Sequence, residues 1–344
     1  MSKCNHLFIV THTDLDGVGA AATLLRIAER KLGYDATVAF TEPYELHLVF
    51  SNLIEHVSRN DCIAVSDLGT NPEHWRELLD SVSSLISKGV RIEWYDHHVW
   101  NNSEIEALRK LGVNLFIDRT TCATGVVAKY ASSLWQNSAD DYIKNLVDVV
   151  CSADLWKWNN PYSPKLFRAV GAKESSYKWK LKVLEKLVSG VLWDEELASR
   201  LEEYISLELE NVKRTLSTVS LTEVDGIRIA VVLKDEGPPA NGILAAILMA
   251  RYSADVVCVV RPNGGLSLRS RTVDVQALSR RLGGGGHPRA AGAKLKIPFL
   301  IGLLSRLTPR ALTKYVAWKL AREVKKEPLP RLPIKEHEED KYYL

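Results

Sequence analysis

Carboxylate and imidazole side chains follow three short β-like runs near the start of the chain, and one further acid lies in a helix-like stretch. These residues are, in chain order, His12, Asp14, Asp16, Asp67, Asp96, His97, His98 and Asp154. Because like charges raise one another's pKa, so many carboxylates can share one crevice only when divalent cations neutralise them. Oxygen ligands suit manganese and magnesium, and the imidazole nitrogens favour manganese. The number of ligands predicts two ions, with Asp67 as a bridge between them.

Two neighbouring divalent ions generate hydroxide at neutral pH and stabilise the transition state of phosphoryl transfer. The residue types therefore predict metal-dependent hydrolysis at phosphorus. Single motifs also have structural interpretations, since Asp14 or Asp16 alone is typical of a helix N-cap and Asp67 alone is typical of a turn after a strand. The occurrence of all four segments in order favours a joint site.

Alternating strands and helices in the first 120 residues must position these side chains. The strands expected are Leu7–Thr11, Thr37–Thr41, Cys62–Ser66, Arg91–Tyr95 and Val113–Ile117. Helices are expected at Gly17–Leu32 and at Pro72–Ser87, the second with Asn71 as N-cap. Such alternation predicts right-handed crossovers and a mostly parallel sheet, whose functional groups gather at the carboxyl ends of the strands.

The remainder of the chain reads as a helical stretch and a second, smaller lobe. Residues from Thr121 to about Ser220 are helical in pattern, and a new strand begins near Ile227. The fold class expected is α/β, with a parallel-sheet lobe, a helical connector, a smaller α/β lobe and a metal-site cleft between the lobes. We expect a catalytic domain at 1–190, a linker at 191–224, a substrate-binding domain at 225–305, and a C-terminal helix and charged tail at 306–344. The tail from Lys325 combines charge with proline and is expected to be loosely ordered.

A basic, glycine-rich segment lies in the second lobe at residues 261–296. It holds eight Lys and Arg residues against one acid, and it contains four consecutive glycines before His287. Glycines let backbone N–H groups approach phosphate oxygens, and arginines add bidentate contacts, so the segment is typical of an anion site. A glycine turn between a helix and a strand, with a solvated basic face, is the structural alternative.

Composition is consistent with a folded globular protein of about two domains. The chain has 344 residues, 46% of them hydrophobic, and a formal net charge of only +3. That near balance does not exclude a nucleic-acid substrate, because the basic segment is offset by an acidic remainder. The five cysteines are scattered and odd in number, which predicts reduced thiols in a cytoplasmic protein, and no segment predicts a membrane span.

The acidic motifs resemble those of the DHH phosphoesterase superfamily in the order of that family. The matching segments are HTDLDG, SDLG, YDHH and the later Asp154. The resemblance implies that one ion is held by His12, Asp14 and Asp67. It implies that the other is held by Asp16, Asp67, His97 and Asp154. His98 would then face the scissile phosphate, and Asp96 would support the histidines.

The segment RSRTVDVQALSRRLGGGGHPRAAGAKL is similar to the GGGH signature of the DHH-associated domain in RecJ- and NrnA-like proteins. That domain binds the nucleotide part of the substrate. The residues that the resemblance assigns to this role are Arg269, Arg271, Gly284, Gly285, Gly286 and His287.

The function expected from the resemblance is exonucleolytic hydrolysis of short single-stranded oligonucleotides, with two manganese ions preferred and magnesium as the alternative. Phosphoadenosine-phosphate phosphatase and cyclic-dinucleotide phosphodiesterase are close alternatives. A pyrophosphatase or exopolyphosphatase, and an inactive replication scaffold, are less favoured, because the GGGH segment and the complete set of acids speak against them. The preference for RNA or DNA, the cleavage polarity and the oligomeric state, a homodimer included, stay open.

Overall fold

The structure, a computed structural model, describes residues 4–135, 137–171 and 175–333. The chain divides into two compact units, Met1–Glu203 and Tyr204–Leu344. Each unit has its own sheet and its own hydrophobic core.

A five-stranded parallel sheet is the centre of the first unit, in the order β2-β1-β3-β4-β5. Its strands are β1 (Leu7–His12), β2 (Ala36–Thr41), β3 (Cys62–Ser66), β4 (Arg91–Asp96) and β5 (Asn114–Ile117). Thr11 pairs with Ser66, and Ser66 pairs with Tyr95, so the carboxyl ends of β1, β3 and β4 lie side by side. The chain segments that follow these three ends therefore meet at one edge of the sheet.

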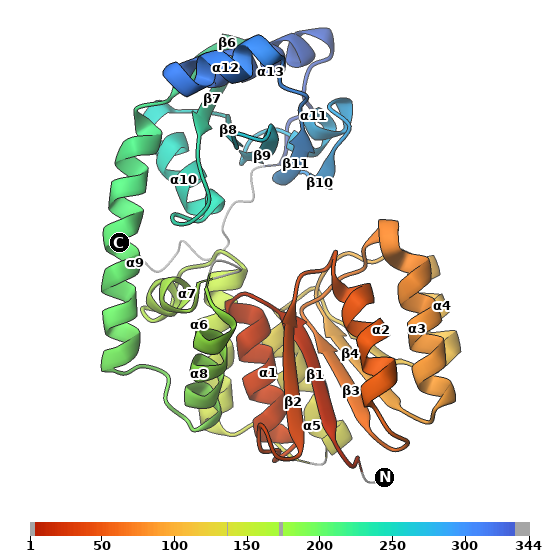
Figure 1. The fold of residues 1–344 in the computed structure, drawn as a ribbon. Coiled ribbons are helices and arrows are strands. Elements are labelled where there is room, and N and C mark those ends of the chain that lie inside the picture. Colours follow the sequence, from red (N-terminus) through yellow and green to blue (C-terminus); the bar gives the residue numbers. More distant parts are fainter. Residues whose placement is uncertain (1–3, 136, 172–174, 334–344) are drawn as a thin grey trace. The chain divides into compact units, whose positions relative to one another are not determined.

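Helices cover both faces of this sheet (Figure 1). One face carries α2 (Leu46–His56), the short 3-10 helix η1 (Pro72–His74), α3 (Trp75–Ser87) and α4 (Asn102–Leu111). The other face carries α1 (Leu15–Ile27) and α5 (Ala123–Trp135), followed by α6 (Asp141–Asp154), α7 (Ser163–Val170) and α8 (Tyr177–Val188). Two apolar cores result, one on each face of the sheet.

Helix α1 is buried along almost its whole length and is rich in glycine and alanine. A Cβ atom on Gly19 would lie 2.7 Å from Thr124 Oγ1 in α5, so only glycine permits this approach of the two helices. The close packing places the first turn of α5 beside the segment that carries Asp16.

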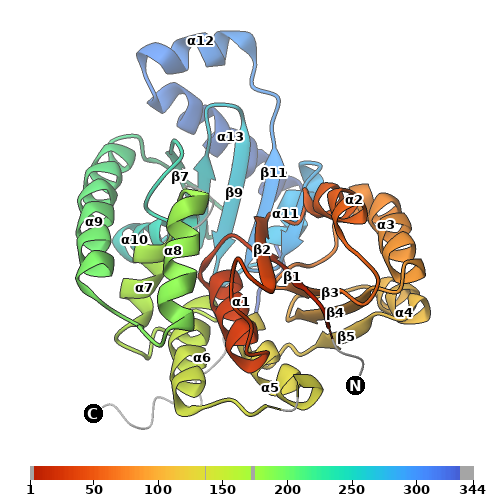
Figure 2. The same ribbon diagram turned by 60° about the horizontal axis from the view of Figure 1, so that its bottom comes forward.

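The second unit contains a six-stranded mixed sheet in the order β10-β11-β9-β8-β7-β6. Its strands are β6 (Ser220–Val224), β7 (Ile227–Leu233), β8 (Val256–Val260), β9 (Gly265–Ser270), β10 (Gly285–His287) and β11 (Ala290–Lys294). Its helices are α10 (Asn241–Tyr252), α11 (Val275–Arg281), α12 (Phe299–Leu307) and α13 (Arg310–Lys326). Helix α9 (Glu195–Leu216) crosses the boundary between the two units. Figure 2 shows α11 and α13 near the strands of this sheet.

The predicted α/β fold class is confirmed, with a parallel sheet first, helices in the middle and a second sheet later. The strands β6, β10 and β11 were not predicted. They are short, polar or rich in glycine and alanine, so they lack the β-branched runs by which strands are recognised.

Two predictions outside the fold class are wrong. The segment from Lys325 is not loose as far as it is described, because Leu329 is buried in the core and Arg331 forms a β-bridge with Val273. Residues 334–344 of the tail lie outside the described residues. The cysteines are not all reduced thiols either, since four of them form the disulfides Cys4–Cys62 and Cys122–Cys151. Their spacing in sequence, 58 and 29 residues, carries no motif from which the pairing could be predicted.

No helix among the described residues is both long and apolar enough to cross a membrane.

Candidate active site

Eight side chains at the carboxyl edge of the first sheet, named above from their spacing, come together in the first unit. Two groups of three offer ligand atoms within 4.8 Å of one another. They are His12, Asp14 and Asp67 in the first group, and Asp16, His97 and Asp154 in the second. Asp67 also joins a further such group with His97 and His98, so it connects the two sets.

Interatomic distances show how closely Asp67 links the two ligand groups. His12 Nδ1 lies 3.1 Å from Asp14 Oδ2 and 3.4 Å from Asp67 Oδ2. The other oxygen of Asp67, Oδ1, lies 3.4 Å from His97 Nε2. The two oxygens of one carboxylate therefore face two different imidazoles. His97 Nε2 is also 3.7 Å from Asp154 Oδ2 and 3.8 Å from Asp16 Oδ2.

Local backbone structure fixes the positions of the side chains in the segment from His12 to Gly17. Asp14 is the N-cap of α1, and its Oδ1 accepts a hydrogen bond from Gly17 N at 3.1 Å. A Cβ on Gly17 would lie 2.2 Å from the carbonyl oxygen of His12, so the return of the chain against the end of β1 requires glycine. The N-cap interpretation and the ligand interpretation of Asp14 are compatible, because its Oδ2 faces His12.

Asp16 is held by the first turn of α5. Its two carboxylate oxygens accept hydrogen bonds from Ala123 N, Thr124 N and Thr124 Oγ1, at 2.7, 2.8 and 2.7 Å. The positive end of the helix therefore stabilises the negative charge of a side chain that is 1% exposed. The disulfide between Cys122 and Cys151 ties this turn to α6, the helix that ends at Asp154.

Asp67 has a backbone conformation that is rare for a residue with a side chain. Its φ is +57°, in the left-handed region, and its N–H donates to the carbonyl of Tyr95. Such strain persists only where the surrounding structure enforces it, and it concentrates at functional sites. Here it turns a buried carboxylate from the end of β3 toward both imidazoles.

Two buried carboxylate oxygens test whether this site fits cations. Asp67 Oδ2 and Asp154 Oδ2 have no hydrogen-bond partner among the described residues. Each has an imidazole nitrogen nearby, at 3.4 and 3.7 Å, but a buried carboxylate oxygen without a hydrogen bond is costly unless a proton or a metal ion satisfies it. A mixed set of carboxylates and imidazoles matches manganese or magnesium, so the residues fit the two ions expected from the sequence.

Burial and the crowding of negative charge also shift the pKa values of the ligand residues in the protein without metal. Burial, together with the charges of Asp14 and Asp16, raises the pKa of Asp67 well above its ordinary value. Burial and the neighbouring carboxylates raise the pKa of Asp154 to about 9. Burial opposes the charged form of His12, but Asp14 and further acceptors outweigh it and raise the pKa of that imidazole. In the metal-free state, protons therefore occupy positions that cations would take.

Asp96 and His98 form a separate pair at the rim of this site. Asp96 is fully buried, and it accepts hydrogen bonds from His98 Nδ1 at 2.8 Å and from Trp100 Nε1 at 2.6 Å. Burial favours its neutral form, but the bonds and the charge of His98 prevail and lower its pKa. Burial opposes the charged form of His98 as well, but the bond to Asp96 outweighs it and raises the imidazole's pKa. His98 is 43% exposed, so it can reach a substrate while Asp96 orients it.

In the second unit, the glycine run forms the short edge strand β10. A Cβ on Gly284 would lie 2.1 Å from Gly292 O, and a Cβ on Gly286 would lie 2.6 Å from Ala291 Cα. Two of the predicted anion-binding glycines are thus required for packing against β11. Gly285 and His287 are exposed and open to a ligand.

The two predicted arginines differ in their surroundings. Burial lowers the pKa of Arg269, whose guanidinium donates to Ser267 Oγ at 3.1 Å, whereas Arg271 is exposed. An open pocket of about 420 Å³ lies on the side of β9 and β11 that carries Ser267. Its polar lining consists of Asn241, Arg261, Asn263, Ser267 and Lys294. Arg261 and Lys294 supply positive charge, as the basic segment predicts, but the pocket does not include the six residues assigned by resemblance.

Sequence reasoning missed three neighbours of the metal-ligand set. Glu42 accepts a hydrogen bond from Thr13 at 2.6 Å, and its other oxygen lies 3.5 Å from His12 Nε2. Thr124 anchors Asp16, and Trp100 anchors Asp96. The position of Glu42 after a predicted strand offered a signal, whereas the contact of Thr124 depends on how α5 packs against α1 and that of Trp100 on the loop after β4.

Residues 226–308 match the DHHA1 domain family. A sequence comparison with curated proteins finds no match. Among solved structures, the pGpG-specific phosphodiesterase PggH from Vibrio cholerae is similar, at 13% identity and a TM-score of 0.55, over 92% of this chain and 99% of that one.

Two further structures have the same fold. An exopolyphosphatase-related protein from Bacteroides fragilis is 12% identical, with a TM-score of 0.52 over 92% of this chain and 94% of that one. CDC45 from Entamoeba histolytica is 8% identical, with a TM-score of 0.52 over 94% of this chain and 95% of that one. At such identities the likeness concerns the fold alone.

Proposed function

This chain has the fold of the DHH phosphoesterase superfamily and carries its DHHA1 domain, and from this premise we propose that it hydrolyses phosphodiester bonds in short oligonucleotides. The reaction requires two divalent ions, and manganese is preferred over magnesium. The observation that carries the proposal is the position of Asp67, whose two oxygens face the imidazoles of two different ligand groups.

The residues that would hold the ions follow from these groups. His12, Asp14 and Asp67 would bind one ion, and the other would be bound by Asp16, Asp67, His97 and Asp154. When bound, the two ions neutralise the negative charge that develops in phosphoryl transfer and lower the pKa of a water molecule. Asp67 and Asp154 each bring a buried oxygen without a hydrogen-bond partner among the described residues.

The protein's own contribution at the phosphate is the pair of Asp96 and His98. Asp96 accepts the Nδ1 proton of His98, so the Nε2 side of the ring is left for the substrate. The bond to Asp96 raises the pKa of His98 and so favours the protonated imidazole. A protonated imidazole can donate a hydrogen bond to a phosphate oxygen and can pass a proton to the leaving oxygen.

The DHHA1 domain favours a nucleotide substrate over a purely inorganic one. Its open pocket of about 420 Å³ has Arg261, Lys294 and three uncharged polar side chains, which suits a phosphate with a sugar or base attached. Phosphoadenosine-phosphate and cyclic or linear dinucleotides have this chemistry too, and PggH is named for its action on pGpG. Short oligonucleotides are the substrate class that we propose.

An inactive scaffold is the alternative from another class, and CDC45 has this fold. All the acids and histidines of the four motifs are present in this chain, and they converge in the first unit. A scaffold has no need for buried carboxylates that repel one another, so the enzyme is the better explanation.

The experiment compares hydrolysis of short RNA, short DNA, phosphoadenosine-phosphate, cyclic dinucleotides and pyrophosphate, each with manganese or magnesium. Variants Asp67→Ala and His97→Ala are expected to lose activity by a factor of about 1000 or more, because the charge stabilisation is removed. The exposed Asp80→Ala on α3 is the matched control and should retain full activity. Undiminished turnover of oligonucleotides by Asp67→Ala would refute the proposal, and turnover of pyrophosphate alone would refute the substrate class.

A further inference from the structure

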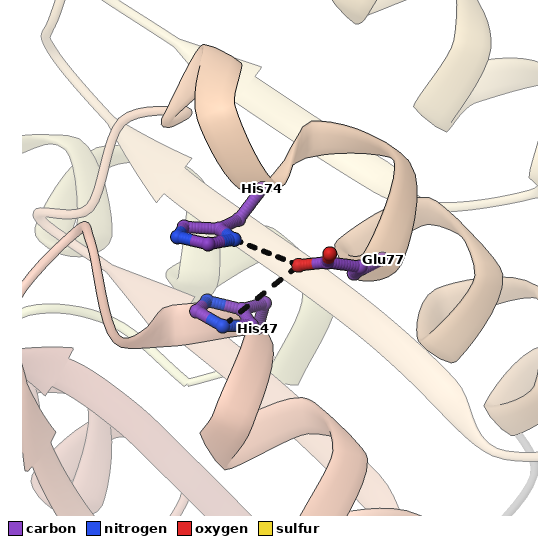
Figure 3. Close-up of side chains that lie close together, drawn as sticks. All are labelled: His47, His74 and Glu77. Atoms are coloured by element: carbon purple, nitrogen blue, oxygen red, sulfur yellow. Dashed lines mark hydrogen bonds and ion pairs between the residues drawn. The ribbon is translucent and has the colours of Figure 1, made fainter.

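A second cluster of metal-ligand side chains lies in the first unit, outside the site described above. It consists of His47 in the first turn of α2, His74 at the end of η1 and Glu77 in the first turn of α3 (Figure 3). Both imidazoles point toward the same carboxylate oxygen. Glu77 Oε2 is 2.8 Å from His74 Nδ1 and 3.8 Å from His47 Nε2.

His47 is poorly satisfied as a hydrogen-bonding group. Its side chain is only 14% exposed, and its Nδ1 is buried without a hydrogen-bond partner in the described part of the chain. Its Nε2 faces Glu77 at 3.8 Å, which is longer than a hydrogen bond. Buried polar atoms in folded proteins nearly always have a partner, so this ring is poorly satisfied at both nitrogens, and a ligand at Nε2 would replace the long contact with Glu77.

The arrangement of the two rings bears on the charge that they can carry. His47 and His74 are stacked, with ring centroids 3.9 Å apart and planes 12° from parallel. Two positively charged rings would repel at this distance, and a single carboxylate could neutralise only one of them. The neutral imidazole is the form that binds metal ions.

We propose that His47, His74 and Glu77 bind one zinc ion. Two imidazole nitrogens and one carboxylate oxygen are a common protein ligand set for zinc, with bonds of about 2.0–2.2 Å. Tetrahedral geometry at such bond lengths places ligand atoms roughly 3.3–3.5 Å apart, and the observed distances of 2.8 and 3.8 Å to Glu77 Oε2 lie on either side of this value. The two rings would have to rotate out of their stacked arrangement so that one nitrogen lone pair of each points at the ion, and a water molecule would take the fourth position.

Zinc fits better than the ions proposed for the acidic site. Magnesium and calcium prefer oxygen ligands, whereas two of the three ligands here are nitrogen. The helix N-termini at α2 and α3 carry partial positive charge, which opposes a cation by a small amount. The charge of Glu77 and two metal–nitrogen bonds outweigh that effect.

The bound ion would join two helices that cover the same face of the parallel sheet. Helices α2 and α3 share the apolar core that includes Phe50 and Leu78. The segment from Asp67 to η1 ends at His74, so the zinc would also fix the far end of the segment that begins with the shared carboxylate. None of the three ligands belongs to the two groups around Asp67, so the ion would lie outside the proposed hydrolytic site. The inference does not rest on the proposed hydrolysis.

The test measures zinc binding directly. Purified full-length protein is stripped of metal, equilibrated with zinc alone, and assayed for bound zinc by mass spectrometry. His74→Ala and Glu77→Gln are expected to bind about one zinc ion fewer per chain than the unmodified protein, or to bind it about 100-fold more weakly. Matched controls are His56→Ala, on the same helix as His47, and Glu73→Gln, which precedes Glu77 by one helical turn; both should bind as the unmodified protein does.

Cobalt absorption provides a second readout that separates the two sites. Cobalt bound by these ligands in tetrahedral geometry gives visible absorption, which should vanish in His74→Ala and persist in Asp67→Ala. Equal zinc stoichiometry and affinity in the unmodified protein, His74→Ala and Glu77→Gln would overturn the proposal. Loss of the cobalt signal in Asp67→Ala, with its retention in His74→Ala, would overturn it as well.

Discussion

Without metal, the first unit is expected to lose stability as the pH rises, because its acidic site holds protons that the unfolded chain releases. Asp154 has a pKa of about 9 in the folded protein, against an ordinary value of 3.8. Its contribution to stability is therefore fully present below about pH 4 and is lost as the pH rises toward 9. The raised pKa of His12 acts in the same direction above its ordinary value of 6.5.

The magnitude follows from the number of protons. One proton bound by the folded state and not by the unfolded state changes the free energy of unfolding by about 1.4 kcal/mol per pH unit. Between about pH 5.5 and about pH 7.5, Asp154 alone should lower the free energy of unfolding by roughly 3 kcal/mol. The variant Asp154→Asn removes this titration. Its free energy of unfolding should therefore fall less steeply with pH, by about 1.4 kcal/mol per pH unit.

The assay is urea unfolding in a chelator at several pH values, with the fluorescence of the first unit's tryptophans as the signal. With excess manganese, the free energy of unfolding should instead rise with pH. The ions compete with protons for the same side chains and bind more tightly as the pH rises. Asp148→Asn, an exposed change on the same helix, is the control and should keep the full slope. A metal-free stability that is flat or rises over this range would refute the electrostatic account, as would an unchanged slope in Asp154→Asn.

Three further predictions concern single features. Asp96→Asn removes the partner of His98, so the alkaline limb of the kcat/KM profile should move to lower pH and activity should fall by about 10- to 100-fold; an unchanged profile would contradict the pairing. Gly17→Ala puts a Cβ 2.2 Å from the carbonyl oxygen of His12, so it should lower the free energy of unfolding by about 1–3 kcal/mol and weaken manganese binding in calorimetry. The control Gly302→Ala, whose Cβ would meet open space, should change neither quantity. The double variant Cys122→Ser/Cys151→Ser lacks the disulfide whose partners are 29 residues apart and should be less stable by about 3–4 kcal/mol in denaturant unfolding; stability equal to that of the unmodified protein would exclude the cross-link.

The first sheet could be predicted because its strands are short apolar runs with clear ends. Cys62–Ser66 has the same bounds in prediction and structure, and the parallel order brings Asp67 beside the end of β4 as expected. The rule that functional side chains gather at the carboxyl ends of parallel strands was enough to group residues far apart in sequence.

Other parts of the site depend on packing that has no sequence pattern. The hydrogen bonds from the start of α5 to Asp16 result from the close approach of α5 to α1. The left-handed backbone of Asp67 is imposed by its surroundings, because an aspartate has no strong preference for it. The disulfides and the cluster of His47, His74 and Glu77 join residues whose separations match no motif, so only the three-dimensional structure reveals them.

The central claim is that Asp67 is shared by two ions in one hydrolytic site, and electron paramagnetic resonance of the manganese-loaded protein tests it most directly. Two manganese ions joined by one carboxylate, about 3.5–4 Å apart, give an exchange-coupled spectrum. We expect that coupled signal in the unmodified protein, and its loss together with the loss of hydrolysis in Asp67→Ala. A spectrum of isolated manganese in the fully loaded, active protein would contradict the claim.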